Sequence, residues 1–192
     1  QKLVDSVILD LFELSKELNI EMIFGTPLLH NGSVFNSLIW FREGKMVIHH
    51  KSKLFNYAGE GKFYSESKDG LSLSGGIALS ICFELRFPEL FSTKRLEFYA
   101  LINIANWPFA REDHYLTLLK SRAIENQSYV LGVNRSGNDP NVKYGNGIAI
   151  LYDYSGKKIE ADFEGNLHGP FRAYNIDFNG QQEFRKKFKF YE

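Results

Sequence analysis

Hydrophobic residues repeat with helical spacing at the start of the chain. Between residues 3 and 18 they stand at Val4, Val7, Ile8, Leu11, Leu14 and Leu18. This spacing predicts an amphipathic helix with one buried stripe. The next apolar run, residues 20–27, predicts a short buried strand that Gly25 and Pro27 should end.

The pattern then changes to that of paired strands and a long connection. Two runs rich in apolar residues flank the segment "REGK", which predicts a β-hairpin over residues 34–50. Residues 51–70 are polar and aromatic without a regular period. Loops of this length in compact domains are usually functional or disordered, and the tyrosines and phenylalanines favour a packed functional loop.

Strands and helices alternate through the middle of the chain. Three mainly apolar runs predict buried strands over residues 76–82, 99–105 and 128–134. Between them we expect a short helix that begins at Pro88 and a longer helix at about residues 112–126.

The last third adds a strand pair around the turn "YSGK" in residues 147–163, a final strand at 171–177 and a terminal helix at 180–188. The alternation of strands, helices and hairpins predicts a mixed sheet in a layered α/β domain. No repeat or linker divides the chain, so residues 1–192 should form a single domain.

Composition excludes several classes of partner. Lys+Arg and Asp+Glu both total 23, so the formal net charge is zero. This balance suggests neither a nucleic-acid partner nor an anionic membrane surface, and no apolar run is long enough to span a bilayer. One cysteine cannot form an internal disulfide, which makes a reducing, cytoplasmic setting the default. Adjacent residues of a strand point to opposite faces, so His49 and His50 make a poor metal pair and we expect no metal site.

The single cysteine, Cys82, ends an apolar strand and is followed at once by charged residues. Lone cysteines in apolar strands are more often inert core residues than nucleophiles. Three features favour a nucleophile: the carboxyl end of a strand collects sites in α/β sheets, the following charges indicate a polar cleft, and a helix start at Pro88 could lower the pKa of a nearby thiol. These local features alone leave both interpretations open.

Other residues could supply the remaining groups of a cysteine hydrolase. Such an enzyme needs a thiolate, a cation or N–H donors for an oxyanion, and a group that moves protons. Lys51 opens the long loop, and Glu60 lies in the glycine-rich and aromatic segment "YAGEGKFY". Trp107 and Arg111 follow a strand end, where they could border a pocket, with Arg111 as a candidate for a substrate carboxylate. A packed tryptophan and a surface arginine explain these two residues equally well.

Together, these residues form the pattern of one enzyme superfamily. The chain resembles the nitrilase, or carbon–nitrogen hydrolase, superfamily. Its nucleophile stretch "CYD-R-P-E" corresponds to residues 82–89, its lysine stretch to residues 50–55, and its second glutamate to Glu60. Residues 105–137 match in order and spacing, and "RAIENQSYVLGVNR" is most similar to the ω-amidase branch. That branch hydrolyses terminal amides of small dicarboxylic acids.

The resemblance implies a fold and a mechanism. The fold would be a four-layer α-β-β-α sandwich, assembled at least as a dimer, with a small amide as substrate and no cofactor. The Cys82 thiolate would attack the amide carbonyl, form a thioester and release ammonia. Lys51 and the backbone N–H of Phe83 would hold the oxyanion, and Glu60 would orient Lys51.

The sequence departs from the family pattern in several places. The general-base glutamate of the family precedes the helix with which this sequence opens, so we expect the N-terminal βα start of the domain, and the base with it, to be missing here. Glu84 stands where the family usually has aspartate, and we expect its longer side chain to reshape the cleft. Lys53 replaces the usual histidine, but spacing favours Lys51 as the lysine that faces Cys82.

Two alternatives to an ω-amidase follow from the same residues. The first is another branch of the superfamily, such as a carbamoylase, an aliphatic amidase or a nitrilase. The second is a catalytically inactive homologue that kept the fold and acts in binding or assembly, which the missing base would favour.

Overall fold

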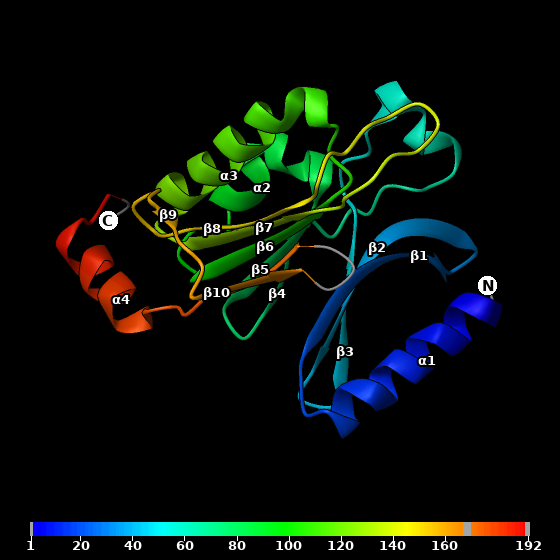
Figure 1. The fold of residues 1–192 in the computed structure, drawn as a ribbon, viewed down its shortest axis with the longest axis horizontal. Helices are drawn as coiled ribbons and strands as arrows, with labels where there is room; N and C mark the ends of the chain where they lie inside the picture. Colours follow the sequence, from blue (N-terminus) through cyan, green and yellow to red (C-terminus); the bar gives the residue numbers. More distant parts are fainter. Residues whose placement is uncertain (1, 167–169, 191–192) are drawn as a thin grey trace.

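Four layers of secondary structure make up the molecule (Figure 1). The computed structural model describes residues 2–166 and 170–190. Helix α1 (Lys2–Glu17) covers one face of a three-stranded antiparallel sheet. Its strands are β1 (Met22–His30), β2 (Ser33–Arg42) and β3 (Lys45–His50). A six-stranded sheet packs on the other face, and α2 (Pro88–Ser92) and α3 (Glu112–Asn126) cover its far side. The expected α-β-β-α sandwich is therefore confirmed.

The parallel strands of the six-stranded sheet all have their carboxyl ends on the same side of the sheet. Its strands, in spatial order, are β4 (Ser72–Ser74), β5 (Ile77–Ile81), β6 (Ala100–Ala105), β7 (Tyr129–Asn134), β8 (Ile148–Tyr152) and β9 (Lys158–Ile159). Strands β5, β6 and β7 run parallel, and the outer strands are antiparallel to their neighbours. The residues that follow β5 and β6 thus emerge side by side, where α/β sheets commonly bind ligands.

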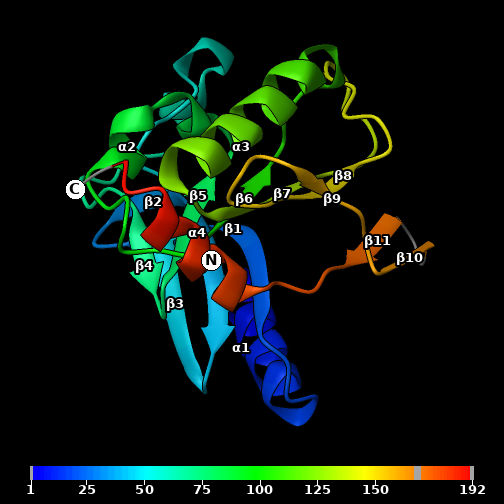
Figure 2. The ribbon, with the colours of Figure 1, turned by 90° about the vertical axis from the view of Figure 1, so that its left-hand side faces the viewer.

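The C-terminal segment lies beside the larger sheet (Figure 2). Strands β10 (Phe163–Asn166) and β11 (Pro170–Ala173) form a separate hairpin, and α4 (Phe178–Lys187) follows it. Arg185 on α4 donates a hydrogen bond of 2.6 Å to the carbonyl of Phe98, and Gln181 donates one of 2.9 Å to the carbonyl of Tyr99. These bonds satisfy carbonyl groups just before β6 and fix α4 at the end of the sheet opposite the carboxyl ends of the parallel strands.

Strand β2 shows why the two sheets and α1 stack in this order. Successive side chains of a strand point to opposite faces. Leu38 and Trp40 pack between the sheets against Leu79 and Ile81 of β5. Their neighbours Ile39 and Phe41 pack instead against apolar residues of α1 and β1. All four of these β2 residues are at most 1% exposed, so this strand is buried on both faces.

A glycine permits the close contact of α3 with the larger sheet. A Cβ atom at Gly132 of β7 would collide with Cδ1 of Leu119, and it would lie 3.2 Å from the hydroxyl of Tyr115. Both side chains belong to α3 and are fully buried. The missing side chain at Gly132 therefore sets how near the helix approaches the sheet.

Most of the predicted elements agree with the structure, but two of the predicted strands differ in extent. The hairpin of β2 and β3, the helix start at Pro88 and the helix over residues 112–126 are confirmed. Strand β1, however, continues through Gly25 and Pro27 to His30. Because β1 is the edge strand of its sheet, the missing N–H of Pro27 removes no bond that the sheet needs.

The second difference concerns the last strand. Residues 171–177 were expected to form it, but β11 ends at Ala173. Residues 174–177 make side-chain and backbone contacts instead, including a hydrogen bond of 3.2 Å from the N–H of Asp177 to the hydroxyl of Tyr129. Asp177 then caps α4, since its carboxylate accepts from the N–H of Gly180 at 3.0 Å.

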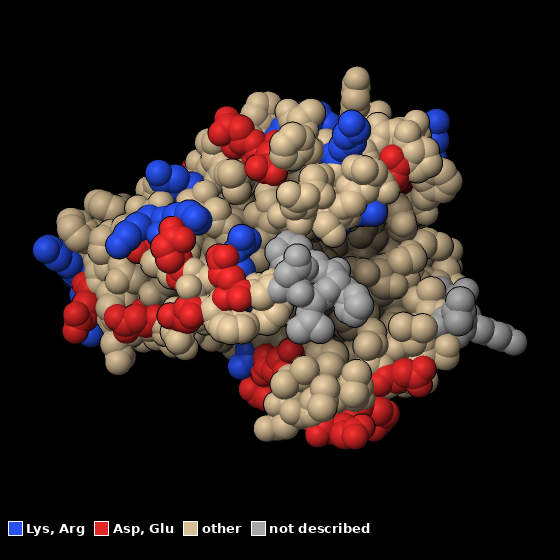
Figure 3. Space-filling model, viewed as in Figure 1, with Lys and Arg blue, Asp and Glu red and all other residues tan. Residues whose placement is uncertain are grey.

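Charges of both signs are mixed on the face shown in Figure 3. Acidic side chains gather at its lower edge, over α1, which carries Asp5, Asp10, Glu13 and Glu17. None of the helices in the described part of the chain has the length and apolar character needed to cross a membrane.

Candidate active site

Cys82 lies directly after β5, as the first residue of the 3₁₀ helix η3 (Cys82–Arg86). Its backbone has φ of +49°, a left-handed conformation that is uncommon for residues with a side chain. Such a conformation costs about 1–2 kcal/mol and persists only where the surroundings impose it. The sharp change from strand to helix turns the thiol out of the sheet toward the cleft that the following paragraphs describe.

Several groups act on the thiol of Cys82 with opposite signs. Burial is the largest influence and raises its pKa, and the nearby carboxylate of Glu60 also raises it. The charge of Lys51 and the backbone N–H groups of Asn106 and Phe83 lower the pKa, because they stabilise a thiolate. The net result is a pKa above the ordinary value, so the expected lowering by the helix at Pro88 does not prevail. At neutral pH the resting thiol therefore needs a base to become a nucleophile.

Lys51 and Glu60 form a close ion pair beside Cys82. The Lys51 ammonium donates to both carboxylate oxygens of Glu60, at 2.8 Å and 2.6 Å. Lys51 is only 2% exposed, and it follows the last residue of β3. Lys53, the other candidate, stacks on the ring of Phe87 instead, with its ammonium 5.3 Å from the ring centre. The preference for Lys51 over Lys53 agrees with this geometry.

The long loop after β3 is built around the Glu60 carboxylate. Besides Lys51, this carboxylate accepts 2.7 Å hydrogen bonds from the side chain of Asn36 and from the backbone N–H of Phe55. Burial by itself raises the pKa of Glu60, but the hydrogen bond and charge of Lys51, with the other two donors, outweigh it and lower the pKa. Glu60 is thus ionised at neutral pH, and its donors hold it in one orientation.

A hollow of about 250 Å³ opens onto Cys82. Its lining includes all three residues that the sequence suggested for substrate binding, Phe83, Trp107 and Arg111. The sequence interpretation missed Arg86, Asn106 and Tyr144, which also line the hollow. Arg86 lies in the nucleophile stretch, and Asn106 directly follows β6. Their positions just after strand ends were the available signal. Among the described residues that line this hollow, none carries a carboxylate.

Two arginines of the hollow rest on aromatic rings. The guanidinium of Arg86 lies 5.2 Å from the ring centre of Trp107, and that of Arg111 lies 5.5 Å from the ring centre of Phe55. Trp107 is held in place because its indole N–H donates to the carbonyl of Arg111 at 2.7 Å, and its backbone exchanges two hydrogen bonds with the Asn134 side chain. Both guanidinium groups are therefore held close to the hollow.

Tyr144 brings the segment between β7 and β8 to the hollow. Its hydroxyl donates to Asp139 at 2.6 Å, and the guanidinium of Arg135 lies 4.4 Å from its ring centre. Burial, and then the hydrogen bond to Asp139, raise the pKa of Tyr144 to about 12, so the phenol is neutral at physiological pH. The tyrosine therefore contributes an aromatic wall rather than a charge.

The two adjacent histidines and Glu84 lie away from this hollow. His49 and His50 point to opposite faces, as expected: His49 contacts Glu84, and His50 contacts the Ser37 hydroxyl at 2.7 Å. Glu84 is fully buried behind Cys82 and is not part of the lining of the hollow. The 3₁₀ turn places residue 84 on the inner side of η3. Within the described ranges, no three His, Cys, Asp or Glu residues are grouped as metal ligands would be.

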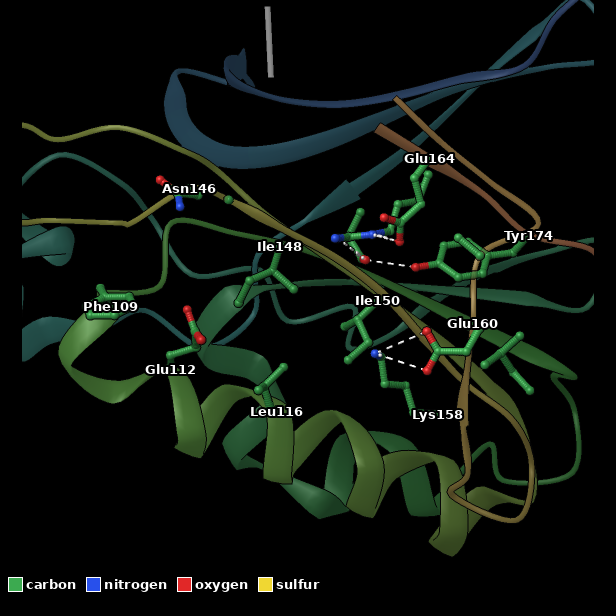
Figure 4. A pocket seen from close by; sticks show the side chains of 15 residues that line it. Phe109, Glu112, Leu116, Asn146, Ile148, Ile150, Lys158, Glu160, Glu164 and Tyr174 are labelled. Carbon is green, nitrogen blue, oxygen red and sulfur yellow. Dashed lines mark hydrogen bonds and ion pairs between the residues drawn. The ribbon is translucent and has the colours of Figure 1, made fainter. Parts of the chain in front are cut away.

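A second hollow, of about 340 Å³, lies between the start of α3 and strands β8 and β9 (Figure 4). Four of its charged groups form two ion pairs: Lys158 with Glu160 at 3.3 Å, and Arg172 with Glu164 at 2.7 Å. Cys82 is not part of its lining. Cys82, the candidate nucleophile, and the two arginines therefore belong to the first hollow.

Comparison with known proteins agrees with this geometry. The sequence profile described as carbon–nitrogen hydrolase matches residues 4–164. The chain belongs to the carbon–nitrogen hydrolase family. Among its relatives is the omega-amidase YafV of Yersinia enterocolitica, 33% identical over 161 residues, with 82% of this chain and 62% of the relative covered. The 2-oxoglutaramate amidase of Bacillus subtilis is 30% identical, with 90% of this chain and 68% of the relative covered.

A solved structure supports the family at the level of the fold. Nit3 of Saccharomyces cerevisiae, described as a member of branch 10 of the nitrilase superfamily, matches with a TM-score of 0.77 and 25% identity. The match covers 95% of this chain and 69% of Nit3. The chain spans less than two thirds of the length of YafV from Yersinia enterocolitica.

Proposed function

We propose that this protein hydrolyses a small linear amide at Cys82, through a thioester and with release of ammonia, as an ω-amidase does. The observation that carries the proposal is the convergence of three groups. A strained cysteine at a strand end, a buried lysine whose charge acts on its thiol, and a hollow lined by two arginines come from separate parts of the chain. The names of the two amidase relatives support the same reaction class.

In the proposed reaction, Cys82 Sγ attacks the amide carbonyl carbon, and its proton passes to a base. The carbon–sulfur bond forms, and the carbonyl oxygen becomes an oxyanion that accepts hydrogen bonds from the Lys51 ammonium and the Phe83 N–H. Collapse of this intermediate breaks the carbon–nitrogen bond, and the leaving nitrogen takes up a proton and departs as ammonia. Water then attacks the thioester, which releases the carboxylic acid and restores the thiol.

Proton transfer is the step for which the hollow itself offers no group. Glu60 already accepts three sets of hydrogen bonds, and its pKa is lowered from the ordinary value, so it is poorly suited to take up and return protons. Its proposed role is to orient Lys51. The glutamate that the family resemblance assigns to proton transfer has no counterpart among the residues that line the hollow. We propose that a glutamate that is not among these lining residues completes the site.

Arg111 is the proposed ligand for a carboxylate at the far end of the substrate, and Arg86 is a second candidate. Both guanidinium groups border the same hollow as Cys82, on aromatic rings that fix their position. A guanidinium binds a carboxylate through two parallel hydrogen bonds, which also fixes the direction of the bound molecule. A linear amide with a carboxylate at its other end would thereby present its amide carbon to Cys82.

The expected assembly and setting are part of this proposal. We propose a dimer or higher homo-oligomer in a reducing, cytoplasmic environment, as the family resemblance and the single cysteine suggest. Light scattering coupled to size-exclusion chromatography would measure the mass in solution. A monomer at micromolar concentration would contradict the assembly without affecting the proposed chemistry.

The decisive experiment measures ammonia release from a panel of compounds by the wild type and by Cys82→Ala. The panel contains 2-oxoglutaramate, a neutral aliphatic amide, an N-carbamoyl amino acid and an aliphatic nitrile. We expect the dicarboxylate monoamide to react fastest, and the variant to lose at least about 10³-fold of that activity. Turnover of only the carbamoyl compound or the nitrile would assign another branch of the family. Absence of turnover by a protein that still binds the amide would favour a binding role.

A further inference from the structure

Glu84 occupies the centre of a polar network behind Cys82, and it is 0% exposed. One of its carboxylate oxygens accepts from the backbone N–H and the hydroxyl of Ser52, at 2.6 Å and 2.7 Å. The other accepts from the backbone N–H of Ile81 at 2.7 Å and contacts Nε2 of His49 at 2.8 Å. Four donors thus converge on one carboxylate, which is enough to compensate for its burial.

These donors belong to the two segments that carry the reactive groups. Ile81 directly precedes Cys82, and Ser52 directly follows Lys51. The Glu84 carboxylate therefore connects the residue before Cys82 with the residue after Lys51. Residue 84 also belongs to η3, the helix whose first residue is Cys82. The left-handed backbone at Cys82 is held on one side by the bond from Ile81 and on the other by the buried side of η3.

His49 keeps this carboxylate charged. Burial raises the pKa of Glu84, but the charge and hydrogen bond of His49, followed by the N–H groups of Ser52 and Ile81, lower it below the ordinary value. An ionised carboxylate only accepts hydrogen bonds, so Nε2 of His49 must carry the hydrogen of their 2.8 Å contact. The other ring nitrogen, Nδ1, lies 3.2 Å from the hydroxyl of Ser72 on β4. The network thus extends from β3 through η3 to the first strand of the larger sheet.

We propose that Glu84, held in place by His49, is a positioning residue that fixes the distance between the Cys82 thiol and the Lys51 ammonium. The inference rests on the proposed function only for its effect on turnover. Its effect on the thiol is independent of any substrate. Since Lys51 lowers the pKa of Cys82, loss of the bridge should weaken that influence and leave the thiol less acidic.

The test uses alkylation of the full chain by iodoacetamide as a function of pH. Cys82 is the only cysteine, so the labelling rate reports on this thiol alone. For Glu84→Gln we expect the inflection to move to higher pH and the rate at pH 7.5 to fall about tenfold. Where turnover is measurable, kcat should fall about tenfold with KM within about twofold, since the substrate pocket is not touched. Simple loosening of the fold would instead expose the thiol and speed labelling.

Matched variants separate positioning from general stability. Glu66→Gln is the control, because Glu66 also accepts from a backbone N–H of the same loop, that of Leu54 at 3.1 Å, but bonds to neither flank of Cys82. It should leave the labelling profile unchanged. An unchanged profile in folded Glu84→Gln, or faster labelling, would overturn the proposal.

A second pair of variants applies if Glu84→Gln does not fold. His49→Gln keeps an N–H donor that can reach the Glu84 carboxylate, whereas His49→Leu removes it. The proposal requires His49→Leu to slow labelling of Cys82 more than His49→Gln does, with partial rescue by the glutamine. Equal labelling profiles in the two variants would contradict it. Failure to hydrolyse any amide, with these labelling shifts intact, would count against the proposed function and leave the positioning role standing.

Discussion

The hollow at Cys82 and the hollow beside β8 and β9 are similar in size but differ in how their charges are arranged. In the second hollow, Lys158 and Arg172 pair with carboxylates that are themselves exposed, on side chains that are 81% and 57% exposed. At the first, the two arginines of the lining rest on aromatic rings, and the Lys51–Glu60 pair lies beside the hollow with side chains that are 3% and 13% exposed. Exposed ion pairs contribute little and are screened by water, whereas a buried cation acts strongly on its neighbours.

The difference also extends to the backbone. Cys82 adopts a left-handed conformation, and carboxylates on two sides, Glu60 and Glu84, hold the surrounding segments. Strain that is maintained by buried bonds marks a position where geometry matters more than stability. The two hollows are therefore distinguished by how their charged side chains are held in place, and not by volume alone.

The largest effect expected in this comparison comes from removing the buried cation beside the first hollow. Lys51→Met should lower kcat/KM about 10²–10³-fold, the usual loss for one oxyanion donor. It also leaves Glu60 without its ionic partner, so the melting temperature should fall as well. Steady-state kinetics with a calorimetric scan would measure both. The double variant Lys51→Met with Glu60→Gln is the control for the orphaned carboxylate: it should recover melting temperature without recovering activity.

Substitution of Arg111 should give a smaller and selective loss. Arg111→Leu is expected to raise KM for a monoamide of a dicarboxylic acid about tenfold or more, because the hydrogen bonds to its carboxylate are lost. A neutral amide lacks that carboxylate, so its kcat/KM should stay within about twofold. Arg86→Leu, measured in parallel, tells which guanidinium binds the carboxylate. Equal losses on charged and neutral amides would remove Arg111 from this role.

Acid should weaken the hydrogen-bond network around Glu60, beside the first hollow. The folded-state pKa of Glu60 is lowered, so the carboxylate contributes stability that is present above its ordinary value of 4.5 and is lost as pH falls below it. Glu84 has the same sign. Urea unfolding at pH values from 3.5 to 6 should show a steep loss of the free energy of unfolding in the wild type and a flatter dependence in Glu60→Gln. Equal pH dependences in the wild type and in Glu60→Gln would show that protonation of Glu60 is not linked to unfolding.

The strain at Cys82 predicts a difference between two inactive variants. Alanine at this position keeps the cost of a left-handed residue, whereas glycine removes it. Cys82→Gly should therefore be about 1 kcal/mol more stable than Cys82→Ala, although glycine has fewer contacts. Urea denaturation of the pair measures this difference. A clearly more stable alanine variant would mean that packing, rather than backbone conformation, decides the stability at this position.

Much of this arrangement could be predicted from the sequence because it depends on local signals. The apolar period gives α1 near the start of the chain, and strand ends followed by charged residues point to Cys82 and Trp107. The spacing of the motifs separates Lys51 from Lys53. These signals involve residues that are close in sequence, so they can be interpreted without knowledge of the tertiary contacts.

Other features depend on partners that are distant in sequence. Strand β1 passes through Pro27 only because it lies at a sheet edge, which the residues around it do not reveal. Glu84 points inward because the left-handed backbone at Cys82 turns η3, and its main partners, Ser52 and His49, lie more than 30 residues away. The N–H of Asn106 acts on the thiol through the backbone, which leaves no mark on the residue type.

The smallest expected effect belongs to the second hollow. Glu160→Gln removes a carboxylate whose side chain is 81% exposed and whose partner, Lys158, is 54% exposed. Because such pairs are screened by solvent, amide hydrolysis should stay within about twofold and the melting temperature should not change measurably. Kinetics and a thermal scan beside Lys51→Met provide the direct contrast. A tenfold loss of activity in Glu160→Gln would mean that the two hollows are coupled, and that charge arrangement alone does not identify the functional one.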